Sequence, residues 1–166
     1  MIKLLPVFMM LLSPPLCHAG SNSINGNTKG LIASAEAGDR VYQFELAKRY
    51  ADGIGVERDY QKAIYWLEKS AQQGFTESQF YLGWLYLHGK GVPENRTEAL
   101  HLLESAAEAG DAYSQYLTAQ IYEKEVMDES PEAPFPDKAV KWYGVACNNH
   151  IFLACERTRV LKIKKD

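Results

Sequence analysis

Residues 38–56 read GDRVYQFELAKRYADGIGV, and residues 74–92 read GFTESQFYLGWLYLHGKGV. The two stretches align without a gap at an offset of 36 residues, and the same offset leads on to a third copy that begins at Gly110. The copies share their first glycine, a glutamine and a tyrosine, and the first two also share a Gly-x-Gly-Val segment. Several independent matches at one offset indicate an internal repeat, so we expect a repeat protein.

The first half of each unit is predicted to be a helix, running roughly from Asp39 to Asp52 in the first copy. Asp39 can accept hydrogen bonds from the free N–H groups of the first turn. The apolar residues fall on one stripe, whose middle position is small in every copy: Ala47, Gly83 and Ala119. A second helix can therefore approach closely there. The Gly-x-Gly-Val segment ends the helix, because glycine enters left-handed conformations without steric cost.

The second half of each unit is predicted to be another helix, capped by Asp59 in the first copy and Asn95 in the second. Its apolar stripe in the first copy consists of Ala63, Trp66, Leu67 and Ala71. Neither helix could bury its stripe alone. Stacked units would build one continuous core, which is the principle of a solenoid.

The N-terminus carries the pattern of a signal peptide. Lys3 precedes an apolar run over residues 4–12, and small residues flank His18 just before position 20. We therefore predict a signal peptide over residues 1–19, cleavage after Ala19, and a periplasmic or secreted protein without stable membrane insertion. An uncleaved anchor and a lipid-modified Cys17 are the alternatives.

The remaining chain divides around the repeats. Residues 20–30 (GSNSINGNTKG) hold one apolar residue in eleven and are expected to be a flexible leader. The connector of the third unit, residues 124–136, lacks Gly-x-Gly and contains three prolines, which predicts a protruding loop. The predicted repeat domain, residues 31–166, has five parts: a half repeat 31–38, repeats 39–74, 75–110 and 111–150, and a capping helix 151–166.

The charge balance bears on the class of partner. The formal net charge is −3, and it becomes −4 once Lys3 is removed with the signal peptide. This balance argues against general nucleic-acid binding, which requires a positive surface.

The repeat resembles the Sel1-like repeat, a relative of the tetratricopeptide repeat. Residues 31–156 carry the resemblance, and its most specific elements are residues 53–56 (GIGV) and 89–92 (GKGV). The resemblance implies an all-α fold, a right-handed α/α superhelical solenoid of helix-turn-helix repeats with the first helices lining a concave face. It also implies a binding or adaptor role, since such repeats are not known as catalytic folds.

Two cysteines, Cys147 and Cys155, remain after the predicted cleavage. They lie at the end of one predicted helix and near the start of the next, so a helix–turn–helix can bring the thiols together, and export supplies an oxidising compartment. We expect a disulfide. The spacing also resembles that of the cysteine-rich bacterial branch of the family. The alternatives are two buried free thiols or a redox pair.

The sequence offers no convincing catalytic, metal or cofactor site. Signatures of metalloproteases, serine hydrolases and phosphate-binding loops are absent. His88, His101 and His150 are scattered without metal-ligand spacing. An acidic patch near the long connector is interpreted as solvated loop charge, with weak cation binding as the alternative: Glu123, Glu125, Asp128, Glu129 and Glu132.

The positions of the first helices that the core does not use are the candidates for binding a partner. By analogy with tetratricopeptide packing, the predicted partner-binding residues are Phe44, Lys48, Phe80, Trp84, His88, Tyr113, Tyr116 and Gln120. The same analogy places Val41, Asp52, Glu77 and Lys124 on that face. The alternative is that the aromatic residues are half-buried packing.

These observations favour a protein that binds another protein and is not an enzyme. Small secreted members of the family resemble immunity proteins that neutralise secreted toxic effectors such as type VI lipases, and that role is our first hypothesis. An envelope adaptor or a host-interaction factor is the second. An enzyme acting on cell-wall fragments, of the cysteine-rich Sel1-like type, is the alternative from another class.

Overall fold

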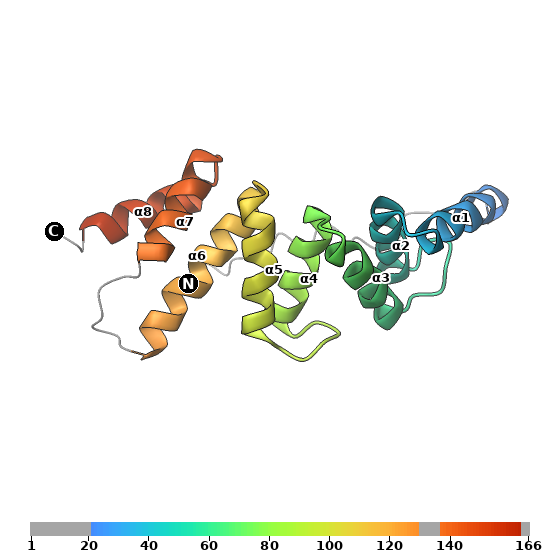
Figure 1. The fold of residues 1–166 in the computed structure, drawn as a ribbon, viewed down its shortest axis with the longest axis horizontal. Coiled ribbons are helices and arrows are strands. Elements are labelled where there is room, and N and C mark those ends of the chain that lie inside the picture. Colours follow the sequence, from blue (N-terminus) through green and yellow to red (C-terminus); the bar gives the residue numbers. More distant parts are fainter. Residues whose placement is uncertain (1–20, 130–136, 164–166) are drawn as a thin grey trace.

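The computed structural model describes residues 21–129 and 137–163, and within these ranges it contains eight helices and no strand. The helices follow one another in chain order along an elongated molecule (Figure 1), and each packs mainly against its neighbours in the chain. This arrangement is the all-α solenoid that the repeat predicts. The helices are α1 (Ser21–Glu36), α2 (Arg40–Asp52), α3 (Tyr60–Gln72), α4 (Thr76–His88), α5 (Arg96–Glu108), α6 (Ala112–Glu129), α7 (Asp137–Asn148) and α8 (Phe152–Ile163).

The predicted helix caps are confirmed. The side chain of Asp39 accepts hydrogen bonds from the first turn of α2. A carboxylate oxygen of Asp59 accepts one from the backbone N–H of Lys62 at 3.0 Å, and the side-chain oxygen of Asn95 accepts one from Glu98 at 3.1 Å. Gly53 follows α2 with a φ of 73°, in the left-handed region that glycine adopts most easily. Local sequence therefore sets where these helices begin and end.

The core runs between the helices as a series of apolar clusters. One cluster joins α2, α3, α4 and α5 around Leu67 and Leu82, and another joins α6, α7 and α8 around Tyr143 and Leu161. The predicted close approach at the small position is confirmed at Gly83, where a Cβ atom would lie 2.8 Å from Cγ of Leu103.

A repeated hydrogen bond links each second helix to the first helix of the next unit. In three successive junctions, a glutamine side chain donates to an alanine carbonyl eight residues earlier: Gln43 to Ala35 at 3.1 Å, Gln79 to Ala71 at 3.5 Å and Gln115 to Ala107 at 3.1 Å. At the last junction the corresponding positions are Cys155 and Cys147, which form the predicted disulfide. A covalent bond therefore replaces the hydrogen bond at the end of the solenoid.

The structure corrects the predicted flexible leader. Residues 21–30 belong to α1, which begins at Ser21 and packs against α2. Thr28 is buried, and its hydroxyl accepts a hydrogen bond from Nη1 of Arg49 at 3.2 Å. Contact with α2 thus outweighs the polar composition of this segment.

The predicted connector at residues 124–136 is also wrong at its start. Helix α6 continues to Glu129, because residues 124–129 contain neither glycine nor proline. The rest of that segment, 130–136, and the predicted signal peptide, 1–19, lie outside the described residues. Within the described ranges, no helix combines the length and the apolar character needed to cross a membrane.

Candidate functional site

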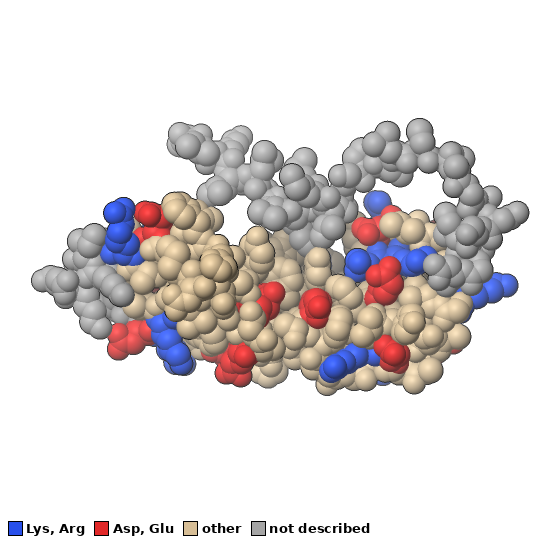
Figure 2. All heavy atoms as spheres, turned by 90° about the horizontal axis from the view of Figure 1, so that it is seen from above, with Lys and Arg blue, Asp and Glu red and all other residues tan. Residues whose placement is uncertain are grey.

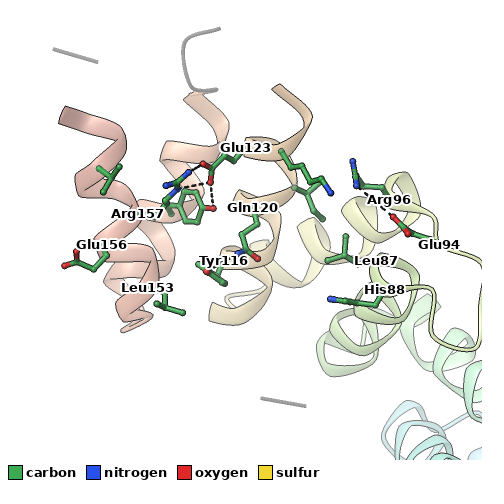
Figure 3. Close-up of a pocket in the computed structure, with 14 residues that line it drawn as sticks. Leu87, His88, Glu94, Arg96, Tyr116, Gln120, Glu123, Leu153, Glu156 and Arg157 are labelled. Atoms are coloured by element: carbon green, nitrogen blue, oxygen red, sulfur yellow. Dashed lines mark hydrogen bonds and ion pairs between the residues drawn. The ribbon is translucent and has the colours of Figure 1, made fainter. Parts of the chain in front are cut away.

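An open groove of about 1020 Å³ crosses the first helices of the last units, α4, α6 and α8. Figure 3 shows Leu87 and His88 of α4 on one side and Leu153 of α8 on the other, with Tyr116 and Gln120 of α6 between them. Because the repeat aligns its first helices, residues far apart in the chain face one common space.

The groove has an apolar component on all three helices. Leu87 lies on α4, the buried Ile121 on α6, and Leu153 and Val160 on α8. Leu153 is 50% exposed and Val160 is also exposed. Exposed apolar side chains lining a groove are a common feature of recognition surfaces.

A charged cluster forms the wall between α6 and α8. Arg157 donates through Nε to Oε2 of Glu123 at 3.1 Å and through Nη2 to Oε1, so the pair is bidentate (Figure 3). The hydroxyl of Tyr143 on α7 donates to the same Oε2 at 2.7 Å. Burial of Tyr143 raises the pKa of its hydroxyl, which therefore stays protonated and remains a donor. The buried carboxylate is fully satisfied by groups from two neighbouring helices.

The remaining charges of the groove lie at its rim. Glu94 and Arg96 form a long ion pair of 4.0 Å. Glu156 pairs at 3.2 Å with Arg159, which does not itself line the groove. Lys124 follows Glu123 on α6, is exposed, and lines the groove.

The structure brings three of the predicted partner-binding residues into this groove: His88, Tyr116 and Gln120. The side-chain amide of Gln120 donates to the hydroxyl of Tyr116 at 3.0 Å. Burial raises the pKa of that hydroxyl. The ring of His88 stacks on that of Trp84, with centroids 4.3 Å apart. Lys124 lines the groove as well.

The other five predicted residues lie outside the groove lining. Phe44 packs against the core, with ring centroids 5.4 Å from Phe75 and 5.5 Å from Tyr81, as the packing alternative holds. Phe80 and Trp84 are half-buried. Two of the five are exposed: Lys48 and Tyr113.

Sequence reasoning missed the charged cluster. Glu123 was expected to be solvated loop charge, but its side chain is only 11% exposed and is paired with Arg157. One signal could have revealed it. At the repeat offset Glu123 aligns with Ala51 and Leu87, so an acidic residue stands where the earlier units are apolar. A charge at such a position requires a partner.

Two further observations bear on the chemistry of the surface. Within the described residues no group of three or more His, Cys, Asp or Glu side chains is arranged to hold a metal ion. On the face seen in Figure 2, basic and acidic side chains alternate, and no region of a single sign dominates. The visible face therefore lacks the continuous positive surface typical of nucleic-acid binding.

Comparisons with known proteins agree with this repeat fold. The Sel1 repeat family model matches residues 41–75, 76–111 and 112–150. A crystal structure of a Sel1 repeat protein from Oxalobacter formigenes is similar, with a TM-score of 0.71 and 34% identity over 80% of this chain and 97% of that one.

A second solved structure extends the comparison. It is a protective antigen present in uropathogenic Escherichia coli strains and displays an SLR fold. The TM-score is 0.70 and the identity 27%, over 85% of this chain and 30% of the antigen's. The chain therefore spans about a third of that protein's length. No curated protein matches the chain.

Proposed function

We propose, given that this chain belongs to the Sel1 repeat family, that it is a non-catalytic module that binds another protein. The observation that carries the proposal is the groove across α4, α6 and α8, which combines exposed apolar side chains with charged groups. Solenoids of this kind present extended surfaces for recognition. Mixed apolar and polar lining of this kind suits a polypeptide surface.

The groove is poorly equipped for catalysis. Its buried carboxylate, Glu123, accepts hydrogen bonds from Arg157 on both oxygens and from Tyr143 on one. A carboxylate held in this way is not available as a nucleophile or general base. Among the described residues, the lining also contains no serine, threonine or cysteine. These features weigh against the alternative of an enzyme that acts on cell-wall fragments.

The finer proposal is that the protein works in the periplasm as an immunity protein that neutralises a secreted toxic effector, for example a type VI lipase. The signal-peptide pattern and the disulfide between Cys147 and Cys155 support an oxidising compartment. A small binding module without recognisable catalytic groups suits inhibition by occlusion. An envelope adaptor or a host-interaction factor is the alternative, favoured by the likeness to a protective antigen.

Trp84 tests the binding role, because its ring stacks on that of His88, which lines the groove. In a pull-down from periplasmic extract with the exported chain as bait, we expect Trp84→Ala to lose most of the captured partner, because large aromatic groups dominate interface energies. The matched control is Tyr65→Ala, which removes an exposed aromatic side chain from the second helix α3. Captured proteins are identified and quantified by mass spectrometry.

Melting temperatures complete this test. Trp84→Ala should melt close to the unchanged protein, since Trp84 is only half-buried. Unfolding of this variant would assign Trp84 to the core. Equal capture by the two variants would contradict a binding role for Trp84. If the captured partner is a toxin, a test of whether the exported chain protects cells against it would distinguish an immunity protein from an adaptor.

A further inference from the structure

We propose that the disulfide between Cys147 and Cys155 is a redox switch for the groove, and that its reduction releases α8 and so removes one wall of the binding surface. The inference rests on the proposed function, because it names a regulation of the proposed binding surface. Four residues of the groove lining belong to α8: Leu153, Glu156, Arg157 and Val160.

The side chains of α8 bury little surface that would hold the helix in place. Among its described side chains, two are almost completely buried, Ala154 and Leu161. Three apolar side chains are exposed: Phe152, Leu153 and Val160. The helix has 12 residues, a length that is marginal for an isolated helix in water, and ordering its backbone costs entropy at every residue. The position of α8 therefore depends on its attachments to the rest of the solenoid.

An ion pair between Arg157 and Glu123 also attaches α8, but it does not replace the disulfide. The Arg157 side chain is 40% exposed, so solvent screens the pair and limits its contribution. Glu123 keeps the hydrogen bond from Tyr143 on α7 when α8 moves away, so its carboxylate is not left without a donor. The main neighbour of α8 is α7, which carries Cys147. The disulfide thus fastens α8 at its principal interface.

The earlier junctions of the solenoid do not depend on redox state. There a glutamine amide donates to an alanine carbonyl, as Gln115 does to Ala107 at 3.1 Å. At the last junction, Sγ of Cys155 lies 3.6 Å from the carbonyl oxygen of Cys147. Reduction places a thiol there, and a thiol is a weak hydrogen-bond donor. The reduced junction therefore has neither the covalent bond nor a strong hydrogen bond in its place.

The reductant is a dithiol. Both cysteines are partly exposed, and α7 and α8 lie at one end of the elongated molecule (Figure 1), so a dithiol can reach the bridge. One of its thiolates attacks the bridge to form a mixed disulfide, which its second thiolate resolves. The bond between Cys147 and Cys155 breaks, and a disulfide forms within the dithiol, which has given up two electrons. Each cysteine takes up one proton and becomes a thiol.

Amide hydrogen exchange followed by mass spectrometry tests the switch in the exported chain, with dithiothreitol as the dithiol. After reduction, we expect exchange in α8 to become about tenfold faster or more, while exchange in α2 and α3 stays unchanged. The matched variant combines Cys147→Ala with Cys155→Gln, which restores the residue pair of the earlier junctions. Its α8 should exchange at the same rate with and without dithiothreitol, and more slowly than α8 of the reduced chain.

Capture of the partner from periplasmic extract tests the consequence for binding. No reductant is added, so any disulfide of the partner stays intact. The variant that combines Cys147→Ser with Cys155→Ser represents the reduced chain and should capture roughly fivefold less partner or below, because a competent groove is populated for a smaller fraction of the time. The variant with alanine and glutamine at these positions should capture nearly as much as the unchanged chain.

Two results would overturn the switch. One is exchange in α8 that dithiothreitol leaves unchanged, and the other is equal capture by the serine variant and the unchanged chain. In the second case the binding role stands, while its control by the disulfide fails. If no form of the chain captures a partner, the binding role fails, and hydrogen exchange still decides whether reduction releases α8.

Discussion

His150 occupies a backbone position that the other units give to glycine. Its φ is 67°, and at the corresponding ends of the preceding second helices Gly38, Gly74 and Gly110 all have positive φ. A side chain with a Cβ atom is strained in this region, whereas glycine is not. The last turn of the solenoid therefore contains a single residue whose replacement by glycine should relieve strain.

We predict that His150→Gly raises the free energy of unfolding by about 0.5–1 kcal/mol, because the relief of left-handed strain exceeds the added entropy of the unfolded chain. Urea denaturation with the disulfide intact measures the change. His101→Gly is the matched control, since His101 lies exposed within α5, where glycine costs about 1 kcal/mol. Destabilisation by both substitutions would show that the turn at His150 is unstrained.

Glu123 shows the limit of reading single residues. Lys124 and Glu125 follow it in the sequence, and nothing local distinguishes a solvated glutamate from a buried one. The partner that satisfies it, Arg157, lies 34 residues away and on another helix. Asp59 presents the opposite case, because it caps a helix that begins at the next residue. Caps are therefore predictable from the local sequence, while the partner of a buried charge is not.

Helix pairing depends on one small position in each first helix. In α4 that position is Gly83, which lies against Leu103 of α5, while α2 and α6 have alanine there. Glycine stands in place of alanine in α4 because the second helix of that unit, α5, approaches this position closely. The repeat pattern predicts that the position is small, and the packing determines how small.

Gly83→Ala should lower the free energy of unfolding by about 1–3 kcal/mol, because the new methyl group overlaps Leu103 in a packed interface. The higher helix propensity of alanine acts in the opposite direction and is the smaller effect. Thermal denaturation compares this variant with Gly144→Ala in α7, where a Cβ would have nothing within 4 Å. Gly144→Ala should be neutral or stabilising. A stable Gly83→Ala protein would mean that α5 can shift away without cost.

At the level of the whole molecule, the last helix is attached differently from the others. Each earlier junction has a glutamine-to-carbonyl hydrogen bond, and the final one has the disulfide between Cys147 and Cys155. Helix α8 has no following unit among the described residues to cover it, yet it supplies Arg157 and Leu153 to the groove. The disulfide thus supports one wall of the candidate binding site.

Removing the disulfide with Cys147→Ser and Cys155→Ser should cost about 2.5 kcal/mol on chain-entropy grounds, since the bond closes a short loop. The loss should be local, because each helix of a solenoid contacts mainly its neighbours. Amide hydrogen exchange followed by mass spectrometry should show faster exchange in α7 and α8 and little change in α2 and α3. An equal increase along the whole chain would contradict this local attachment.

Periodic information was enough to predict the solenoid. Signals within one unit, or between adjacent units, predict the helix pairs, the capping residues, the small position and the cysteine pair. Residue type and spacing can be read there directly from the sequence. The groove required three-dimensional coordinates. Its ion pair joins helices that do not follow each other in the chain, and the buried hydroxyl of Thr28 on α1 accepts a hydrogen bond from Arg49 of α2. Each of these contacts occurs once in the chain, so the repeat alignment does not predict it. Each stabilises the protein only after the two helices have packed against each other.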